Sequence, residues 1–299
     1  MATYLPEQVR VGLALPHGIV GDRRKLVTAA EEAGYQYLTI ADHVVGADTT
    51  NRPDWKGRYD VTDPFREVFV HLGHLAALTT LELVPSVLVL PQRQTALVAK
   101  QAAELALLSQ GGIRLGVGVG WNAVEFESLG IPFSSRAARM EEQITVLRKL
   151  WSEPVVSFTG EFHRLDQVGI APLPSEPIPV WLGGGLGATE PARERVRRRI
   201  VTHGDGWITA PQLAPEQLVP AAAALRSCAE REGRDPTSIG LQVTLAVGAE
   251  DDEATLRDRL ALILQAGPTH ITVDGRGTGT SLAEHIEISS AAAHLISQE

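Results

Sequence analysis

Two residues able to carry a proton follow an apolar run near the start of the chain. Residues 36–40 are typical of a strand, and Asp42 and His43 come directly after it. Because imidazole ordinarily titrates close to neutral pH, a histidine in such a place can donate or accept a proton in catalysis. We predict that His43 is catalytic and that Asp42 orients it. The alternative is that His43 only makes a structural hydrogen bond between the strand end and the next loop.

A second candidate site lies where a glycine-rich strand ends. Residues 113–119 are apolar but interrupted by glycine, and Gly120, Trp121 and Asn122 follow. Gly118 and Gly120 offer bare backbone, to which a flat aromatic surface and an amide are then added. This set suits a flat heteroaromatic ligand with an amide edge. Alternatively, the glycines only relieve crowding inside a barrel and Trp121 is part of the core. A dinucleotide fingerprint is disfavoured, because its glycines should open a helix at once.

A run of three glycines is a candidate phosphate site. Gly183, Gly184 and Gly185 follow a predicted strand at 178–182 and precede a predicted helix at 189–200. Bare backbone N–H groups next to the amino end of a helix attract anions. The alternative is a glycine-rich turn that binds nothing.

The longest polar loop, at 44–62, should lie over these residues. Within an acidic chain it carries a group of cationic and aromatic side chains, namely Arg52, Trp55, Lys56, Arg58 and Tyr59. We predict that Trp55 and Arg58 bind an acidic or phenolic substrate or an anionic coenzyme tail. Alternatively, the loop is a solvated lid with no role in binding.

Charge and composition exclude several classes of partner. Of the 299 residues, 27 are Lys or Arg and 36 are Asp or Glu, and the net charge of −9 argues against nucleic acid or a membrane as the partner. The single cysteine, Cys228, cannot form an internal disulfide, which fits a reducing, cytoplasmic setting. No signal peptide is visible, and the most apolar segment, 81–90, is too short to span a bilayer. The histidines are scattered without metal-ligand spacing, so no metal site is expected.

The elements that must position these residues follow one repeating pattern. Strand-like runs alternate with helical patterns eight times, which predicts a parallel sheet and, at this length, an α/β (β/α)8 TIM barrel. The predicted strands are 9–15, 36–40, 81–90, 113–119, 178–182, 206–208, 239–247 and 269–273. In such a barrel the active site lies at the carboxyl ends of the strands, where the candidate residues stand.

The helices have local signals for their ends. Asp22 is a candidate N-cap and Gly34 a stop, Asp63 and Pro64 open a helix to about Leu78, and an acidic turn opens another over 250–264. Further helices are predicted at 95–109, 134–151, 215–231 and 281–296. Residues 153–179 break the pattern and are predicted to be a small hairpin insertion within one domain covering 1–299.

Several motifs resemble the bacterial luciferase-like flavin and deazaflavin oxidoreductases. They are Asp42-His43, the segment 86–91 with 99–103, GVGVGW followed by Glu125-Phe126, the helix at 136–151, the segment 180–184 and GDGW at 204–207. They occur in the family's order over residues 9–210. The GVGVGW version is most similar to the branch that uses the deazaflavin coenzyme F420.

The resemblance implies roles for particular residues. It places a non-prolyl cis peptide between Ser86 and Val87 behind the coenzyme ring. Gly118, Gly120, Trp121 and Asn122 match the segment beside the ring and its ribityl chain. Gly183 and Gly184 match the phosphate-holding turn, and Asp42 and His43 lie near the reactive face. The family also implies a homodimer formed through the helices predicted at 63–78 and 95–109.

The function implied is hydride transfer between F420 and a small organic substrate. The first alternative is an FMN-dependent luciferase-like monooxygenase, and the second is a non-catalytic flavin- or deazaflavin-binding protein. Relatives that oxidise a sugar phosphate have a glutamate at the position of Trp121, which disfavours that activity here. We expect F420 to bind more tightly than FMN, because Arg58, with Arg52, Lys56 and Arg276, can meet an anionic tail.

Overall fold

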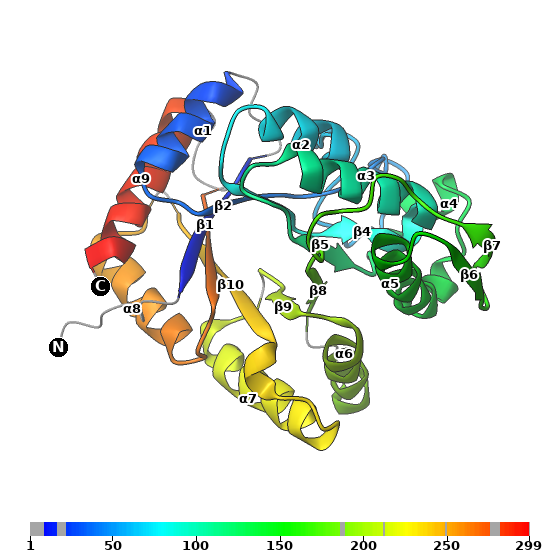
Figure 1. Ribbon diagram of the computed structural model, residues 1–299. Coiled ribbons are helices and arrows are strands. Elements are labelled where there is room, and N and C mark those ends of the chain that lie inside the picture. Colours follow the sequence, from blue (N-terminus) through cyan, green and yellow to red (C-terminus); the bar gives the residue numbers. More distant parts are fainter. Residues whose placement is uncertain are drawn as a thin grey trace.

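Parallel strands form a nearly closed barrel at the centre of the molecule (Figure 1). The computed structural model describes residues 9–16, 22–185, 189–211, 213–248, 250–275 and 282–298. The sheet order is β3-β2-β1-β11-β10-β9-β8-β5-β4. The bounds are β1 Arg10–Ala14, β2 Tyr37–Ile40, β3 Glu82–Pro85, β4 Leu88–Val89, β5 Leu115–Gly118, β8 Val180–Gly184, β9 Gly206–Thr209, β10 Gly240–Ala246 and β11 His270–Asp274. The predicted (β/α)8 barrel is confirmed.

The strand predicted as one piece over 81–90 is in two pieces. β3 pairs with β2, whereas β4 pairs with β5 on the other side. The peptide bond between Ser86 and Val87, which joins the two pieces, is cis, as the resemblance predicted. Strands β3 and β4 therefore occupy one position in the barrel, and an isolated bridge between Leu83 and Ile113 brings β3 next to β5.

The helices surround the sheet (Figure 1). Their bounds are α1 Arg23–Glu32, α2 Val68–Ala76, α3 Thr95–Leu108, α5 Arg136–Ser152, α6 Glu190–His203, α7 Pro215–Arg231, α8 Glu253–Leu264 and α9 Leu282–Gln298. Asp22 caps α1 as predicted, by accepting a hydrogen bond from Arg24 N, and Gly34 follows the helix with φ +82°. Between α1 and β2, a residue without a Cβ atom is therefore well suited to the turn.

Two predicted helix starts are wrong. Helix α2 begins at Val68, and its N-cap is Glu67, because the Asp63 carboxylate accepts from Asp60 N instead. Helix α8 begins at Glu253 after the cap Asp252. In both segments the polar residues that suggested an earlier start are used by the preceding loop.

The amino-terminal end of the barrel is closed by a buried cation. Arg114 lies with its guanidinium 4.2 Å from the ring centre of Trp181 and donates to Gln242 and Glu82. These residues come from the starts of different strands, and Arg114 is almost fully buried. Ligands can therefore be expected only at the opposite, carboxyl end of the strands.

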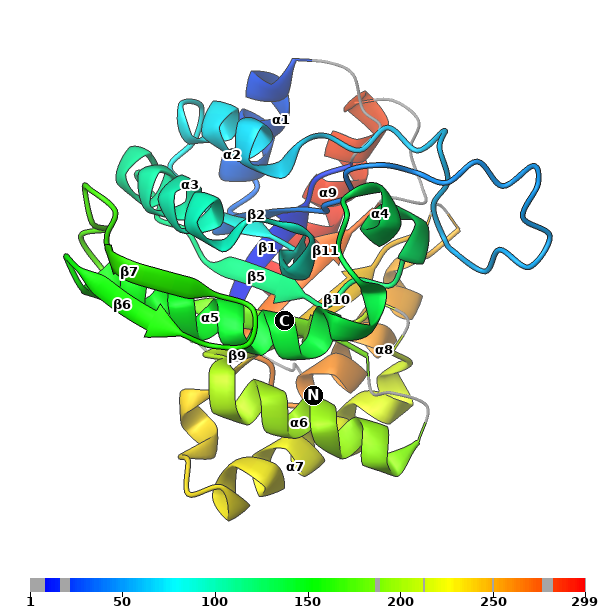
Figure 2. The same ribbon diagram turned by 90° about the vertical axis from the view of Figure 1, so that its right-hand side faces the viewer.

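The predicted hairpin insertion is confirmed. Strands β6 (Val156–Thr159) and β7 (Arg164–Val168) pair antiparallel and lie beside α5 (Figure 2). Glu142 of α5 anchors the turn by accepting from the backbone N–H groups of Glu161 and Phe162. Within the described segments, no helix combines the length and the apolar character that a membrane span needs.

Candidate active site

A cavity of about 300 Å³ opens at the carboxyl ends of the strands. Its walls bring together most of the predicted site residues: Asp42 and His43 after β2, Ser86 and Val87 before β4, Gly118, Gly120 and Trp121 at the end of β5, Gly183 and Gly184 of β8, and Arg58 of the 44–62 loop. Three predicted residues, Asn122, Gly185 and Trp55, are not part of the walls as far as the structure describes the chain.

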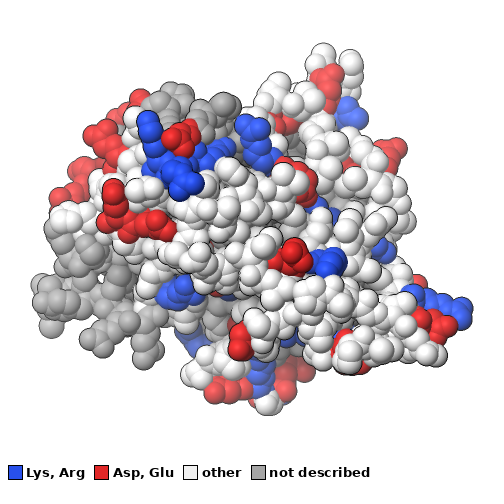
Figure 3. All heavy atoms as spheres, turned by 45° about the horizontal axis from the view of Figure 1, so that its top comes forward, with Lys and Arg blue, Asp and Glu red and all other residues white. Residues whose placement is uncertain are grey.

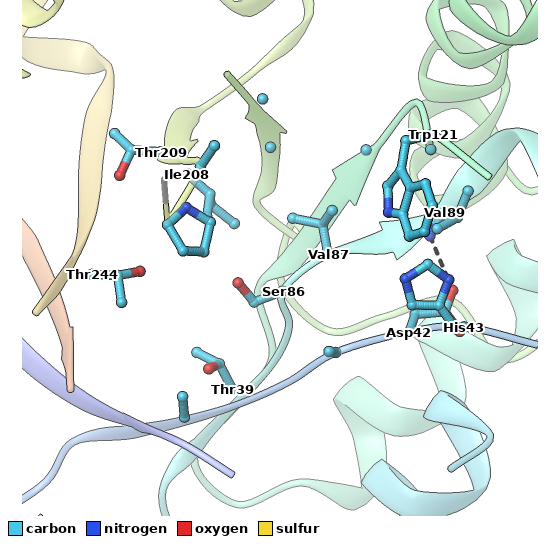
Figure 4. A pocket seen from close by; sticks show the side chains of 18 of the residues that line it. Thr39, Asp42, His43, Ser86, Val87, Val89, Trp121, Ile208, Thr209 and Thr244 are labelled. Atoms are coloured by element: carbon cyan, nitrogen blue, oxygen red, sulfur yellow. Dashed lines mark hydrogen bonds between the residues drawn. The ribbon is translucent and has the colours of Figure 1, made fainter. Parts of the chain in front are cut away.

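Val87 stands at the centre of the cavity (Figure 4). A Cβ atom on Gly118 or on Gly183 would lie 2.5 Å from a methyl carbon of Val87. Glycine is thus required at both positions, because the Val87 side chain fills the space between β5 and β8. Gly120 is required for another reason, its φ of +73°. The outcome is a small apolar platform in the middle of a polar-edged cavity.

His43 is oriented by a glutamate and not, as predicted, by Asp42. The Nδ1 atom of His43 lies 3.0 Å from Oε2 of Glu125, a residue only 1% exposed. Oε1 of Glu125 accepts from the backbone N–H groups of Val44 and Val45. Burial alone would raise the pKa of Glu125, but the hydrogen bonds from His43 and Val44 outweigh it and lower that pKa. A carboxylate there holds the proton of His43 on Nδ1 and leaves the lone pair on Nε2.

Asp42 has a different set of partners. Its carboxylate accepts from Nη2 of Arg93 at 2.8 Å and from Val89 N at 3.0 Å. Burial raises the pKa of Asp42, although the Arg93 guanidinium acts in the opposite direction. Arg93 also donates to Glu67, the N-cap of α2. Asp42 therefore ties the end of β2 to β4 and α2, beside the cavity rather than behind His43.

Asn122 acts through a helix that the sequence reasoning missed. The short helix α4, Ala123–Ser128, starts with the Oδ1 atom of Asn122 accepting from Val124 N and Glu125 N. The Oδ1 atom of Asn122 is thus used for capping and its side chain is buried, while the contact of its amide with a ligand stays a prediction. Because α4 presents Glu125 to His43, the cap supports the site indirectly. The sequence signal for it was an asparagine followed three residues later by glutamate.

Aromatic side chains gather around His43. We call His43, Trp55, Tyr59, Phe65 and Trp121 the aromatic cluster. The His43 ring centre lies 4.7 Å from that of Phe65, 5.4 Å from Tyr59 and 5.5 Å from Trp121. Trp55 does not reach the cavity but packs on Trp121, at 5.8 Å. The loop at 44–62, which extends from the barrel beside α4 in Figure 2, thus contributes two of the five rings.

Hydroxyl groups line the cavity away from the aromatic cluster. Thr39, Ser86, Thr209 and Thr244 come from four separate segments of the barrel and lie opposite His43 and Trp121 in Figure 4. Their side chains make no hydrogen bond within the described part of the chain, although Thr39 and Thr209 are each only 4% exposed. In contrast, Thr272 bonds to the hydroxyl of Tyr37. Because these hydroxyls line the cavity, they can hydrogen-bond to the polar edge of a ligand. In the sequence, only their position near the ends of predicted strands could have marked these four residues as part of a site.

The predicted phosphate turn is only partly described. Gly184 O accepts from Nε1 of Trp207, and α6 begins at Glu190 after Thr189. The residues between Gly185 and Thr189 lie outside the described residues, as does Arg276, which we expected to contact a coenzyme tail. In the described segments, no group of three or more His, Cys, Asp or Glu side chains is placed to hold a metal ion.

The chain matches known oxidoreductases over most of its length. An F420-dependent glucose-6-phosphate dehydrogenase of Nakamurella multipartita is 30% identical over 246 residues, 78% of this chain and 65% of that protein. The pyrimidine monooxygenase RutA of Escherichia coli is 30% identical over 203 residues, 65% of this chain and 54% of that one. In both alignments the matched segment spans less than two thirds of the relative's length.

Solved structures and a family model agree with this fold. A structure of an F420-dependent secondary alcohol dehydrogenase with an F420-acetone adduct superposes with a TM-score of 0.76 at 16% identity, covering 97% of this chain and 99% of that one. The relatives of this chain include F420-dependent dehydrogenases and a monooxygenase. The model of the luciferase-like monooxygenase family matches residues 4–294, and the chain therefore belongs to that family.

Proposed function

We propose that the protein is an oxidoreductase that binds F420 and transfers a hydride between the deazaflavin ring and a small organic substrate. The observation that carries the proposal is the His43–Glu125 pair, set at the edge of a cavity with an apolar platform. The relatives named for F420-dependent dehydrogenation support the choice of coenzyme.

The cavity fits a flat heteroaromatic group. Val87 offers the apolar surface on which a ring can lie, and the unpaired hydroxyls of Thr39, Ser86, Thr209 and Thr244 can bond to its polar edge. The backbone of Gly184 and Gly185, close before α6, would hold the phosphate. Arg58, which lines the cavity, would meet an anionic tail. When bound, the deazaflavin supplies or accepts the hydride.

Residues of this chain would accept and return the proton that leaves the substrate hydroxyl. Glu125 keeps His43 with its proton on Nδ1, so that Nε2 can accept the proton of a substrate hydroxyl during oxidation. In the reverse direction, the same imidazole returns a proton to the oxygen of a carbonyl. Asp42 and Arg93 hold the strand ends on which His43 and Val89 stand. Trp121 and Tyr59 shield the imidazole from water.

An FMN-dependent monooxygenase is the second candidate. The similarity to pyrimidine monooxygenase RutA favours it, and the platform and hydroxyls would also accept an isoalloxazine ring. A non-catalytic coenzyme carrier would have no use for the His43–Glu125 pair.

The deciding experiment is a pair of titrations with F420 and with FMN at the same moderate ionic strength. We expect F420 to bind at least about tenfold more tightly, a difference of about 1.4 kcal/mol. The exposed Arg58 side chain can supply this only if the bound coenzyme tail covers it and removes the contact from water. Arg58→Ala should reduce that preference. Equal or tighter binding of FMN would overturn the assignment in favour of the monooxygenase. If His43→Ala has no effect on turnover of any substrate while F420 binds, the carrier is the better description.

A further inference from the structure

We infer that the aromatic cluster binds a flat apolar ring of the substrate, so that the substrate is an aryl alcohol or aryl ketone rather than a sugar phosphate. This inference rests on the proposed function for the identity of the reacting group, but the binding site itself stands on separate observations.

The first observation is the enclosure of His43 by rings. Tyr59 and Trp121 both line the cavity, at 5.4 and 5.5 Å from the His43 ring centre, and Phe65 packs against the edge of His43. A hydroxyl or carbonyl that reaches Nε2 must therefore bring its neighbouring atoms into contact with Tyr59 and Trp121. These neighbours meet aromatic surfaces, which favour a planar ring in an offset or edge-on arrangement.

The second observation is that Trp121 is 42% exposed at the cavity wall. A tryptophan gains from covering its apolar surface, and part of the Trp121 surface stays exposed although its ring packs near those of Trp55, His43 and Tyr59. A substrate ring placed against Trp121 would remove more of that surface from water. A small ketone such as acetone is too small to do so.

The third observation concerns charge. In the described part of the cavity wall, Arg58 is the single cationic side chain, and its guanidinium lies 5.7 Å from the ring centre of Tyr59. A sugar phosphate needs several donors around its hydroxyls and strong cations at its phosphate. Around His43 the structure instead provides rings, and the unpaired hydroxyls lie on the opposite side of Val87 (Figure 4).

The rings are also held in place before any ligand arrives. A Cβ atom on Gly57 would lie 2.4 Å from Trp121 and 2.5 Å from Trp55, so the loop backbone packs directly on both indoles. Val61 N donates to Ala47 O and ties the two ends of this loop together. Preorganised rings lose little freedom on binding, which favours affinity for a matching flat ligand.

Equilibrium dialysis with acetophenone, acetone and glucose 6-phosphate tests the inference, first without coenzyme and then with saturating F420. We expect acetophenone to bind at least tenfold more tightly than the other two. Trp121→Ala should lower its affinity at least tenfold, whereas Trp121→Phe, which keeps a ring, should stay within about threefold. Phe158→Ala on the distant hairpin strand β6 is the control for loss of a ring elsewhere and should change nothing.

The outcomes separate the inference from the proposed function. Failure of F420 to bind overturns the proposed function, while the Trp121 series still decides whether the cluster is an aryl site. If F420 binds but displaces acetophenone, the aryl group occupied the place of the coenzyme ring and the inference is wrong. It is equally wrong if Trp121→Ala leaves acetophenone binding unchanged or if glucose 6-phosphate binds as tightly.

Discussion

Replacing Glu125 with glutamine should reverse the tautomer of His43. In the native site, the carboxylate accepts from Nδ1 of His43 at 3.0 Å and from the Val44 and Val45 N–H groups through its other oxygen. In Glu125→Gln the amide oxygen can keep the two backbone bonds, which leaves the NH₂ group facing Nδ1. Because an NH₂ group only donates, Nδ1 must become the acceptor and the proton moves to Nε2. The imidazole can then no longer accept a substrate proton there.

The expected loss of activity in Glu125→Gln follows from the loss of proton transfer by His43. General acid–base catalysis by a placed side chain contributes about 10²- to 10⁴-fold, so kcat for alcohol oxidation should fall by about that factor. Folding should suffer much less, by about 1–2 kcal/mol, since both backbone donors keep a partner. Nitrogen chemical shifts of His43 measured by NMR report the tautomer directly and need no substrate. Glu127→Gln, an exposed position on the same helix α4, is the matched control.

The substitution Glu125→Gln should also change how stability depends on pH. Because the folded-state pKa of Glu125 is lowered, its charge adds stability above its unfolded pKa, and this stability is lost as the pH falls through the folded pKa. The difference in stability between wild type and Glu125→Gln should therefore shrink in acid. If NMR finds His43 of the variant still protonated on Nδ1, or if kcat is unchanged, Glu125 does not set the tautomer and the mechanism is refuted.

Three other predictions concern packing, acid stability and assembly. Gly183→Ala should lower the free energy of unfolding by about 1–3 kcal/mol, because the added methyl group overpacks Val87, and adding Val87→Ala should restore most of that stability. A double-mutant cycle measured by urea unfolding that finds no coupling between the two positions would contradict their close approach. Burial and the positive charges of Arg114 and Arg10 lower the pKa of His270 to about 3. Below about pH 6.5 only the unfolded state therefore takes up a proton at this residue, and the free energy of unfolding decreases by up to about 1.4 kcal/mol for each unit by which the pH falls. His270→Asn should flatten that slope between pH 6.5 and 4, and an unchanged slope would be evidence against it. Val70 of α2 and Leu108 of α3 are apolar side chains that are 74% and 58% exposed. Because the surface around α2 is also mostly uncharged in Figure 3, we expect both residues to lie in a homodimer interface. Val70→Asp should shift the mass measured by light scattering from dimer to monomer, and a wild type already monomeric at micromolar concentration would exclude the dimer.

The fold could be predicted because its signals are local and repeat. Alternation of strand and helix patterns gave the barrel, and helix 215–231 was predicted at its observed bounds. Local signals failed where two nearby groups could do the same task. Asp63 and Glu67 are both chemically able to cap α2. The Asp63 carboxylate instead accepts a hydrogen bond from Asp60 N, and Glu67 is held in place by a hydrogen bond from Arg93. The cis peptide between Ser86 and Val87 was predicted from the family resemblance alone, and the division of the third strand into β3 and β4 was not predicted.

Most of the predicted site residues line one cavity, but the hydrogen-bond partners of His43 and Asp42 were not predicted, because these partners lie far away along the chain. His43 and Asp42 are adjacent, which made them natural partners, yet adjacent residues that leave a strand point in different directions. Asp42 reaches Arg93, 51 residues away, and His43 reaches Glu125, 82 residues away. A pairing over such separations is set by the barrel's closure, which no short pattern encodes.

Asn122 has a structural task that its position after a glycine-rich strand did not indicate. Its amide was expected to contact a ligand, and the structure shows that its Oδ1 atom caps α4, three residues before Glu125. The cap fixes where α4 begins, the start of α4 fixes where the Glu125 carboxylate lies, and that carboxylate fixes the protonated nitrogen of His43. Asn122→Ala should therefore cost about 1 kcal/mol in stability and also disturb the His43 tautomer, whereas Asn122→Asp, which keeps a capping oxygen, should preserve both. A loss of stability in Asn122→Ala with an unaltered His43 tautomer would show that the position of Glu125 does not depend on its helix.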